Sequence, residues 1–203
     1  MLNETIKYYN KKGFKEEYMK KITWNSPVIL SFALISLIAL GLNTATNGAT
    51  NQLLFSVYGG SLLNPLFYLR LFTHVLGHVN LTHYMNNMLL FLLVGPMLEE
   101  KYGSHRLLIV ILVVALITGI VHIIIDPNSM LLGASGVVFS FILLSAVTGS
   151  KEGIPLTFII VAILYIGTQI YEGVFNVDNV SQLTHIIGGI IGGIFGITVR
   201  KKR

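Results

Sequence analysis

Residues 106–125 read RLLIVILVVALITGIVHIII, and after Arg106 this run contains no Asp, Glu, Lys or Arg. Crossing the hydrocarbon core of a bilayer takes about 20 consecutive, mostly apolar residues in an α-helix. The run therefore predicts a transmembrane helix. Five other segments have a similar length and character, and these are residues 25–43, 82–99, 131–148, 154–171 and 181–199. The sequence thus predicts an all-α membrane protein built as a six-helix transmembrane bundle.

The composition agrees with a membrane protein. Of the 203 residues, 53% are hydrophobic and 11% are charged, whereas a soluble domain carries about 25% charged residues. The chain contains no cysteine, which excludes disulfides, thiolate catalysis and thiolate metal sites. We expect residues 1–24 to form a short cytoplasmic N-terminal segment and residues 25–203 to form one transmembrane domain.

Basic residues indicate how the chain is oriented. Residues 53–72 are a seventh apolar candidate, interrupted by Gly, Asn-Pro and Arg70. If six segments span and both termini are cytoplasmic, every basic residue except Arg70 lies on the cytoplasmic side, as the positive-inside rule favours. Seven spans divide the basic residues evenly. We therefore expect residues 44–80 to form an extracytoplasmic, partly membrane-embedded loop, and the positive charge to reflect topology rather than nucleic-acid binding.

Polar residues recur at one depth of the predicted bundle. The second, fourth and sixth predicted helices all run inward from the extracytoplasmic side, and each carries polar residues near its start: His83 and Asn87, Ser135, and His185. At 1.5 Å per residue, all of them lie within about two turns of that surface. Ionisable groups inside a membrane segment are costly, which makes each a candidate functional residue.

These residue types match the requirements of acyl transfer. A serine hydroxyl is a weak nucleophile unless a neighbouring base accepts its proton, and His185 is the candidate base for Ser135. No acidic residue is expected at the same depth, so we predict a Ser–His dyad without a third member. The alternative for each residue alone is a packing serine or a hydrogen-bonded core histidine.

A tetrahedral intermediate also needs hydrogen-bond donors for its oxyanion. His83 and Asn87 are spaced i, i+4 and share a helix face, and the backbone N–H of Ser135 is a third candidate donor. Gly133 and Gly136 flank the serine, where they permit a backbone turn and close approach of a substrate.

Three further residues are candidates for supporting the dyad. Phe139 follows Ser135 by one turn and either stacks on His185 or makes an ordinary lipid or core contact. Gly188 and Gly192 form a G-x-x-x-G on the His185 helix, which lets two helices approach closely. For that motif alone, ordinary tight packing is the more frequent explanation.

Taken together, the motifs Gly133-Ala134-Ser135-Gly136, His185-x-x-Gly188-x-x-x-Gly192 and His83-x-x-x-Asn87 resemble the rhomboid family of intramembrane serine proteases. The resemblance extends over about residues 66–199. It implies that Ser135 is the nucleophile, His185 the base, and His83 and Asn87 the oxyanion donors. Two departures are visible, because Leu69 precedes Arg70 where the family often has Trp, and Phe139 stands where Tyr is frequent.

The resemblance also implies a function. It predicts a multi-pass cell-membrane serine endopeptidase that cleaves single-span membrane proteins near the extracytoplasmic boundary and uses no cofactor or metal. One alternative is a non-catalytic rhomboid-like protein that binds membrane clients. The other is a metal site or transporter using His74, His78 and His83, since the first two are spaced i, i+4.

Overall fold

The computed structural model describes residues 23–148, 154–175 and 179–198, and these residues are helical apart from loops and one isolated β-bridge. The α-helices are α2 (Pro27–Ala45), α3 (Pro65–Thr73), α4 (Leu81–Tyr102), α5 (Ser104–Ile125), α6 (Ser135–Thr148), α7 (Leu156–Phe175) and α8 (Asn179–Thr198). A π-helical turn, Asn51–Phe55, and a 3₁₀ turn, His74–Leu76, complete the first long loop. The predicted all-α class is confirmed, while residues 1–22 of the predicted N-terminal segment 1–24 lie outside the described residues.

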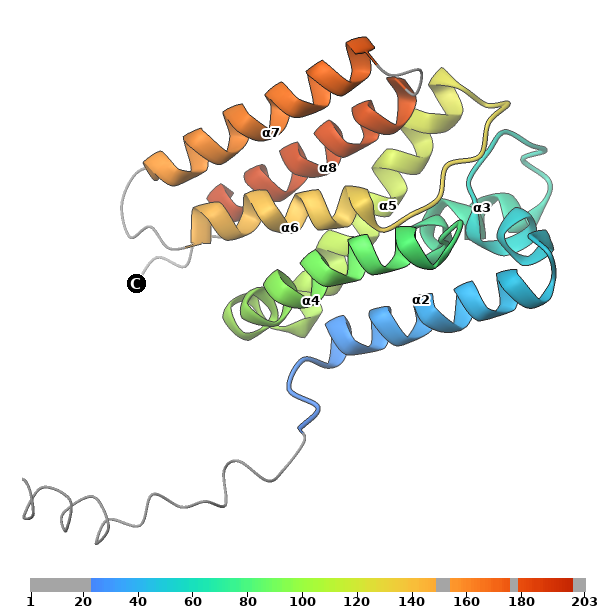
Figure 1. Cartoon of the computed structure of the whole chain (residues 1–203), viewed down its shortest axis with the longest axis horizontal. Coiled ribbons are helices and arrows are strands. Elements are labelled where there is room, and N and C mark those ends of the chain that lie inside the picture. Colours follow the sequence, from blue (N-terminus) through green and yellow to red (C-terminus); the bar gives the residue numbers. More distant parts are fainter. Residues whose placement is uncertain (1–22, 149–153, 176–178, 199–203) are drawn as a thin grey trace, which may run out of the picture.

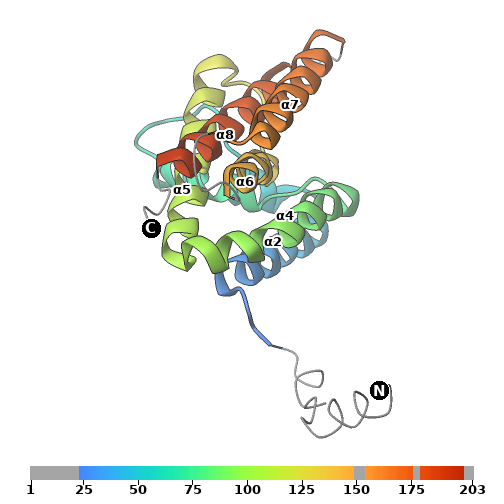
Figure 2. The same ribbon diagram turned by 90° about the vertical axis from the view of Figure 1, so that its left-hand side faces the viewer.

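The long helices pack side by side. Helices α2, α4, α6 and α8 follow one another across the bundle, α7 lies beyond α8, and α5 runs behind them at a steep angle (Figures 1 and 2). The starts of α4, α6 and α8 face the same end of the molecule (Figure 1). This arrangement brings the polar residues at those starts toward one another.

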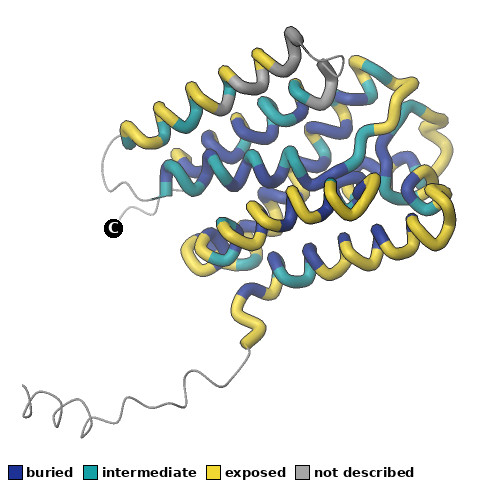
Figure 3. The backbone as a smooth tube through the Cα atoms, in the orientation of Figure 1, coloured by how far each residue is buried: buried dark blue, intermediate teal, exposed yellow. Residues whose placement is uncertain are grey.

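Two described helices, α2 and α5, are both long and apolar enough to cross a membrane by themselves. Helix α6 and residues 182–198 of α8 are apolar but shorter. The prediction of six spans with cytoplasmic termini therefore stays a prediction. Much of α2 and α4 is exposed (Figure 3). The exposed residues include large apolar ones such as Leu34, Ile38, Leu89 and Leu93. Such a surface suits lipid contact.

The seventh apolar candidate, residues 53–72, does not form one long helix. It divides into the π-helical turn and α3, and α3 has nine residues, about 14 Å in length. That is less than half of the ~30 Å hydrocarbon core. Asn64 begins α3 by accepting the Leu66 N–H on its side chain, and Pro65 takes the first helical position, where its missing N–H is harmless.

Helix α6 begins four residues later than the predicted fourth span. Leu131 instead pairs with Val57 in an antiparallel bridge, with N–O distances of 2.9 and 3.0 Å. Gly133 has a φ of 130°, a conformation that ends any regular helix and favours glycine. The predicted start of the fourth span at residue 131 was wrong, because an apolar loop and an apolar helix have the same hydropathy. Through the bridge, the loop before α6 is hydrogen-bonded to the first long loop.

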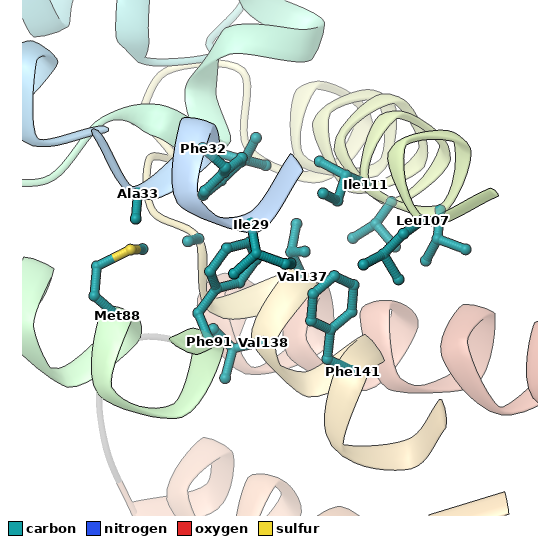
Figure 4. Close-up of a cluster of buried hydrophobic side chains, with 14 of the residues drawn as sticks. Ile29, Phe32, Ala33, Met88, Phe91, Leu107, Ile111, Val137, Val138 and Phe141 are labelled. Atoms are coloured by element: carbon teal, nitrogen blue, oxygen red, sulfur yellow. The ribbon is translucent and has the colours of Figure 1, made fainter. Parts of the chain in front are cut away.

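A buried apolar core joins α2, α4, α5 and α6 (Figure 4). The rings of Phe91 and Phe141 stack with centroids 5.2 Å apart, and Phe32 lies against Phe91 at 4.7 Å. Gly95 leaves space for the Ile29 side chain, because a Cβ added at position 95 would lie only 2.6 Å from that side chain. This core fixes α4 against α6 and thereby positions the residues at their starts.

Glu99 holds the opposite end of the same helices together. Its side chain is buried, and its two carboxylate oxygens accept the N–H groups of Val28 and Ile29 at 3.0 and 3.1 Å. The Ser104 hydroxyl donates to the same carboxylate at 2.7 Å. The first N–H groups of a helix have no partner within the helix. Glu99 of α4 therefore caps α2 in place of Ser26, whose side chain makes no capping bond.

We expect Glu99→Ala to destabilise the protein by about 2–3 kcal/mol, because one buried and one part-buried N–H group lose their acceptor. Glu100→Ala is the matched control, since Glu100 is the neighbouring carboxylate and is exposed. The measurement is the thermal unfolding midpoint of purified protein in detergent. Equal midpoints for the two variants would remove Glu99 from this role.

Candidate active site

Ser135 is the first residue of α6, and His185 lies in the second turn of α8. The Ser135 Oγ is 2.7 Å from the His185 Nε2, a normal distance for a hydrogen bond in which the hydroxyl donates to a ring nitrogen. The two residues are 50 positions apart in the chain. The structure therefore brings together the two side chains singled out as nucleophile and base.

Glycines allow α6 and α8 to approach closely at this point. A Cβ on Gly188 would lie 2.2 Å from the Gly136 carbonyl oxygen, and one on Gly192 would lie 2.0 Å from the Ser140 carbonyl oxygen. Neither position accommodates a side chain without movement of a backbone. Both glycines thus set the separation of the helices that carry Ser135 and His185.

Phe139 lies beside the imidazole. The ring centroids of Phe139 and His185 are 4.8 Å apart with an interplanar angle of 50°. Contacts of this kind limit how an aromatic ring can rotate. Of the two alternatives drawn from the spacing, the contact with His185 is the one that the structure contains.

His83 and Asn87 approach the loop that precedes Ser135. A Cβ built on Gly133 would lie 2.9 Å from the His83 Cε1 and Nε2 atoms and 3.9 Å from the Asn87 Nδ2 atom. Asn87 is buried, and its Nδ2 has no hydrogen-bond partner among the described residues. The Asn87 side chain therefore offers an unused donor next to the backbone of the Ser135 loop.

Asn80 and His78 hold His83 in this position. The Asn80 side chain accepts the His83 N–H at 2.8 Å and so caps α4, an interaction that asparagine commonly makes. The His78 ring packs edge-on against His83, with centroids 5.0 Å apart. The Val79 N–H points to the His83 Nδ1 at 3.5 Å. Neither Asn80 nor His78 was assigned to the site from the sequence, because a cap and a ring contact are visible only in space.

His74 and His78 each form a hydrogen bond with a backbone carbonyl oxygen. His74 Nε2 lies 3.0 Å from the Ala115 carbonyl oxygen, and His78 Nδ1 lies 3.1 Å from the Leu76 carbonyl oxygen. Burial lowers the pKa of each imidazole to about 4, so both rings are neutral near pH 7. Residues 23–148, 154–175 and 179–198 contain no group of three or more His, Cys, Asp or Glu arranged to hold a metal ion.

Arg70, in helix α3 of the first loop, is buried. Its guanidinium carbon lies 3.9 Å from the centre of the Tyr58 ring, a cation–π geometry. Tyr58 therefore provides a partner for a buried charge. Arg70 and Tyr58 are 12 positions apart in the sequence, and nothing in the sequence pattern of the loop indicated that they are in contact.

The Rhomboid domain family model matches residues 65–202. Rhomboid-related protein 1 of Caenorhabditis elegans is 32% identical over 132 residues, which cover 60% of this chain and 37% of that protein. Rhomboid protease GluP of Bacillus subtilis is 26% identical over 174 residues, covering 83% of this chain and 33% of that protein.

A shorter relative is covered more fully. Rhomboid protease GlpG of Haemophilus influenzae is 28% identical over 138 residues, which cover 66% of this chain and 71% of that protein. The matched part of the chain spans about a third of the length of the first two relatives. The matched region contains Ser135, His185, His83 and Asn87.

Proposed function

The chain belongs to the rhomboid family, and from this premise we propose that it is an intramembrane serine endopeptidase with Ser135 as nucleophile and His185 as general base. The observation that carries the proposal is the 2.7 Å separation of the Ser135 Oγ and the His185 Nε2. A base must lie within hydrogen-bonding reach of the proton that it removes, and this pair meets that requirement.

The proposed reaction divides peptide hydrolysis into two steps. The Ser135 oxygen attacks the scissile carbonyl carbon while the hydroxyl proton passes to the His185 Nε2. The imidazolium then gives this proton to the leaving amine as the C–N bond breaks, which leaves an acyl-enzyme. A water molecule, deprotonated by His185, attacks the ester in the second step, and the proton returns to Ser135. The contact with Phe139 keeps the imidazole aimed at the hydroxyl throughout.

The oxyanion formed in each step needs donors. We assign this role to the Ser135 backbone N–H and to the side chains of His83 and Asn87. The Val79 N–H points to the Nδ1 of His83, which leaves the proton of a neutral ring on Nε2, one of the two ring atoms that lie against Gly133. Gly133 lies against both side chains, so an oxygen held in front of the Ser135 N–H lies near these donors as well.

The site lies at one end of the bundle, near the starts of α4, α6 and α8 (Figure 1). With six spans and cytoplasmic termini, this end is extracytoplasmic, because all basic residues except Arg70 then lie on the other side. We therefore propose a multi-pass cell-membrane protein whose substrates are single-span membrane proteins, cleaved near the extracytoplasmic boundary of the bilayer.

Labelling with a fluorophosphonate tests the proposal directly, because such reagents modify a serine only when its oxygen is activated. We expect the wild type to be labelled at Ser135, and Ser135→Ala to remain unlabelled. A folded wild type that resists labelling and cleaves no single-span protein would favour the alternative, a non-catalytic rhomboid-like protein that binds membrane clients.

Asn87→Ala is expected to lower kcat by about 10²-fold, the usual effect of removing one oxyanion donor. Some activity remains because His83 and the Ser135 N–H still donate. Asn86→Ala is the matched control, since Asn86 is the adjacent carboxamide and is exposed. Unchanged turnover in Asn87→Ala would remove Asn87 from the oxyanion role.

A further inference from the structure

Besides the bridge between Val57 and Leu131, the loop before α6 has an attachment to the first long loop that is closer to Ser135. The Gly133 N–H donates to the His74 carbonyl oxygen at 3.0 Å. Gly133 is only two residues before Ser135. The backbone that leads into the candidate nucleophile is therefore held by a residue more than 50 positions earlier in the chain.

Gly133 is the residue through which this bond affects the candidate active site. Its φ of 130° lies in the left-handed region, and glycine has the widest backbone freedom, so its conformation depends on outside contacts. Opposite the bond to His74, a Cβ on Gly133 would lie 2.9 Å from the His83 ring and 3.9 Å from the Asn87 Nδ2. A rotation of the Gly133 backbone would move the Ser135 N–H relative to both side chains.

The turn that presents the His74 carbonyl group is short. The 3₁₀ turn His74–Leu76 has three residues, and the Gly77 N–H donates to the same carbonyl oxygen at 3.2 Å. Hydrogen bonds in 3₁₀ turns have poorer geometry than those in α-helices. The turn's own hydrogen bonds therefore do little to fix the direction of the His74 carbonyl group.

The His74 side chain attaches this turn to α5. Its Nε2 lies 3.0 Å from the Ala115 carbonyl oxygen, and because a carbonyl oxygen only accepts, the Nε2 carries the proton and donates it. The side chain is 2% exposed, and its Nδ1 has no hydrogen-bond partner among the described residues. Gly119 leaves space for the ring, since a Cβ there would lie 3.4 Å from the Nε2. One side-chain hydrogen bond thus links α5 to the turn that holds Gly133.

We propose that His74 is a positioning residue of the protease. Its ring is fixed by Ala115, and its carbonyl oxygen holds Gly133 so that the Ser135 N–H faces the oxyanion. The inference rests on the proposed protease function and adds a residue that acts through Gly133 without touching the substrate. Because the oxygen becomes charged only as the reaction proceeds, a misdirected N–H slows the chemical step and changes substrate binding little.

Two substitutions separate the hydrogen bond of the ring from its volume. In His74→Gln, the amide nitrogen is as many bonds from Cβ as the imidazole Nε2 and is able to donate to the Ala115 carbonyl oxygen, whereas His74→Met has similar length and no donor. We expect His74→Met to lower kcat about 10-fold with KM within about 2-fold of wild type. His74→Gln is expected to keep kcat within about 3-fold of wild type, because the donor is retained.

The measurement is cleavage of a single-span substrate by the full chain in liposomes. Rates are divided by the number of Ser135 sites that a fluorophosphonate titrates at saturation, so a loss of folded protein alone does not change kcat. A peptide aldehyde gives a second readout, since its hemiacetal with Ser135 places an oxygen at the oxyanion position. We expect His74→Met to weaken inhibition by the aldehyde about 10-fold, in parallel with kcat/KM.

His122→Met is the matched control. His122 is also 2% exposed, its Nε2 lies 3.0 Å from the Ser129 carbonyl oxygen, and its Nδ1 likewise has no partner within the described part of the chain. Its acceptor lies six residues before Ser135 and four before Gly133. This variant should also unfold at a lower temperature, while its kcat and its inhibition by the aldehyde should stay within about 2-fold of wild type.

The outcomes separate this role from the protease function. Wild-type kcat per titrated site in His74→Met overturns the positioning role alone, even when that variant unfolds at a lower temperature. Equal losses of kcat in His74→Gln and His74→Met, or in His122→Met and His74→Met, also overturn it. If His74→Met does not fold, His74→Asn replaces it, because its amide is one bond too short to reach Ala115. Absence of any Ser135-dependent cleavage overturns the protease and the positioning role together.

Discussion

Replacing Ser135 by alanine is expected to lower cleavage of a single-span substrate by at least about 10³-fold, with no loss of folded protein. The variant keeps the substrate site and the oxyanion donors but has no oxygen to attack the carbonyl. His185→Ala should have an equally large effect, since the Ser135 hydroxyl then lacks its base. The measurement is the rate of product formation by purified protein in liposomes, followed on gels.

The double variant tests whether the two residues act as a unit. Removing both should be no worse than removing one, because either loss already ends proton transfer. Ser140→Ala is the matched control: Ser140 is a buried serine on the same helix, and its hydroxyl has no partner within the described residues. Full activity in Ser135→Ala would disprove the proposed mechanism, and inactivity of Ser140→Ala would show that the assay reports packing.

Much of this architecture was predictable from local properties of the sequence. Hydrophobic run length locates helices such as α5, whose observed limits are residues 104–125 against the predicted 106–125. Ser135, His83 and His185 each lie near the start of a helix, and the three helices run in the same direction. Helix geometry therefore predicts that the three residues lie at a similar depth. The sequence resemblance then indicated which of these polar residues lie together.

The remaining features depend on contacts between distant segments. The hydropathy of the predicted span 82–99 does not indicate that its last residue, Glu99, is buried and hydrogen-bonded to Val28 and Ile29 of another helix. The start of α6 moved because Leu131 finds a bridge partner in Val57. Hydropathy predicts neither feature. In both, a backbone group forms its hydrogen bond with a residue about 70 positions away in the chain and not with a local partner.

Gly188→Ala is expected to lower kcat by about 10²-fold through geometry alone. The new Cβ would lie 2.2 Å from the Gly136 carbonyl oxygen, where ordinary contact begins at 3.4 Å. Helices α6 and α8 must therefore separate by about 1 Å at the level of the dyad, and a misplacement of this size commonly lowers a rate about 10²-fold. The overpacked variant should also unfold at a lower temperature.

Gly41→Ala controls for the loss of a helical glycine as such. Gly41 lies in α2, and a Cβ there meets nothing within 4 Å, so alanine should leave activity unchanged and favour the helix by up to about 1 kcal/mol. Fluorophosphonate labelling of the folded fraction, isolated by size exclusion, separates misplacement from unfolding. Folded Gly188→Ala that reacts as fast as wild type would show that the Ser135–His185 distance tolerates the added methyl group, and the glycines would then serve packing alone.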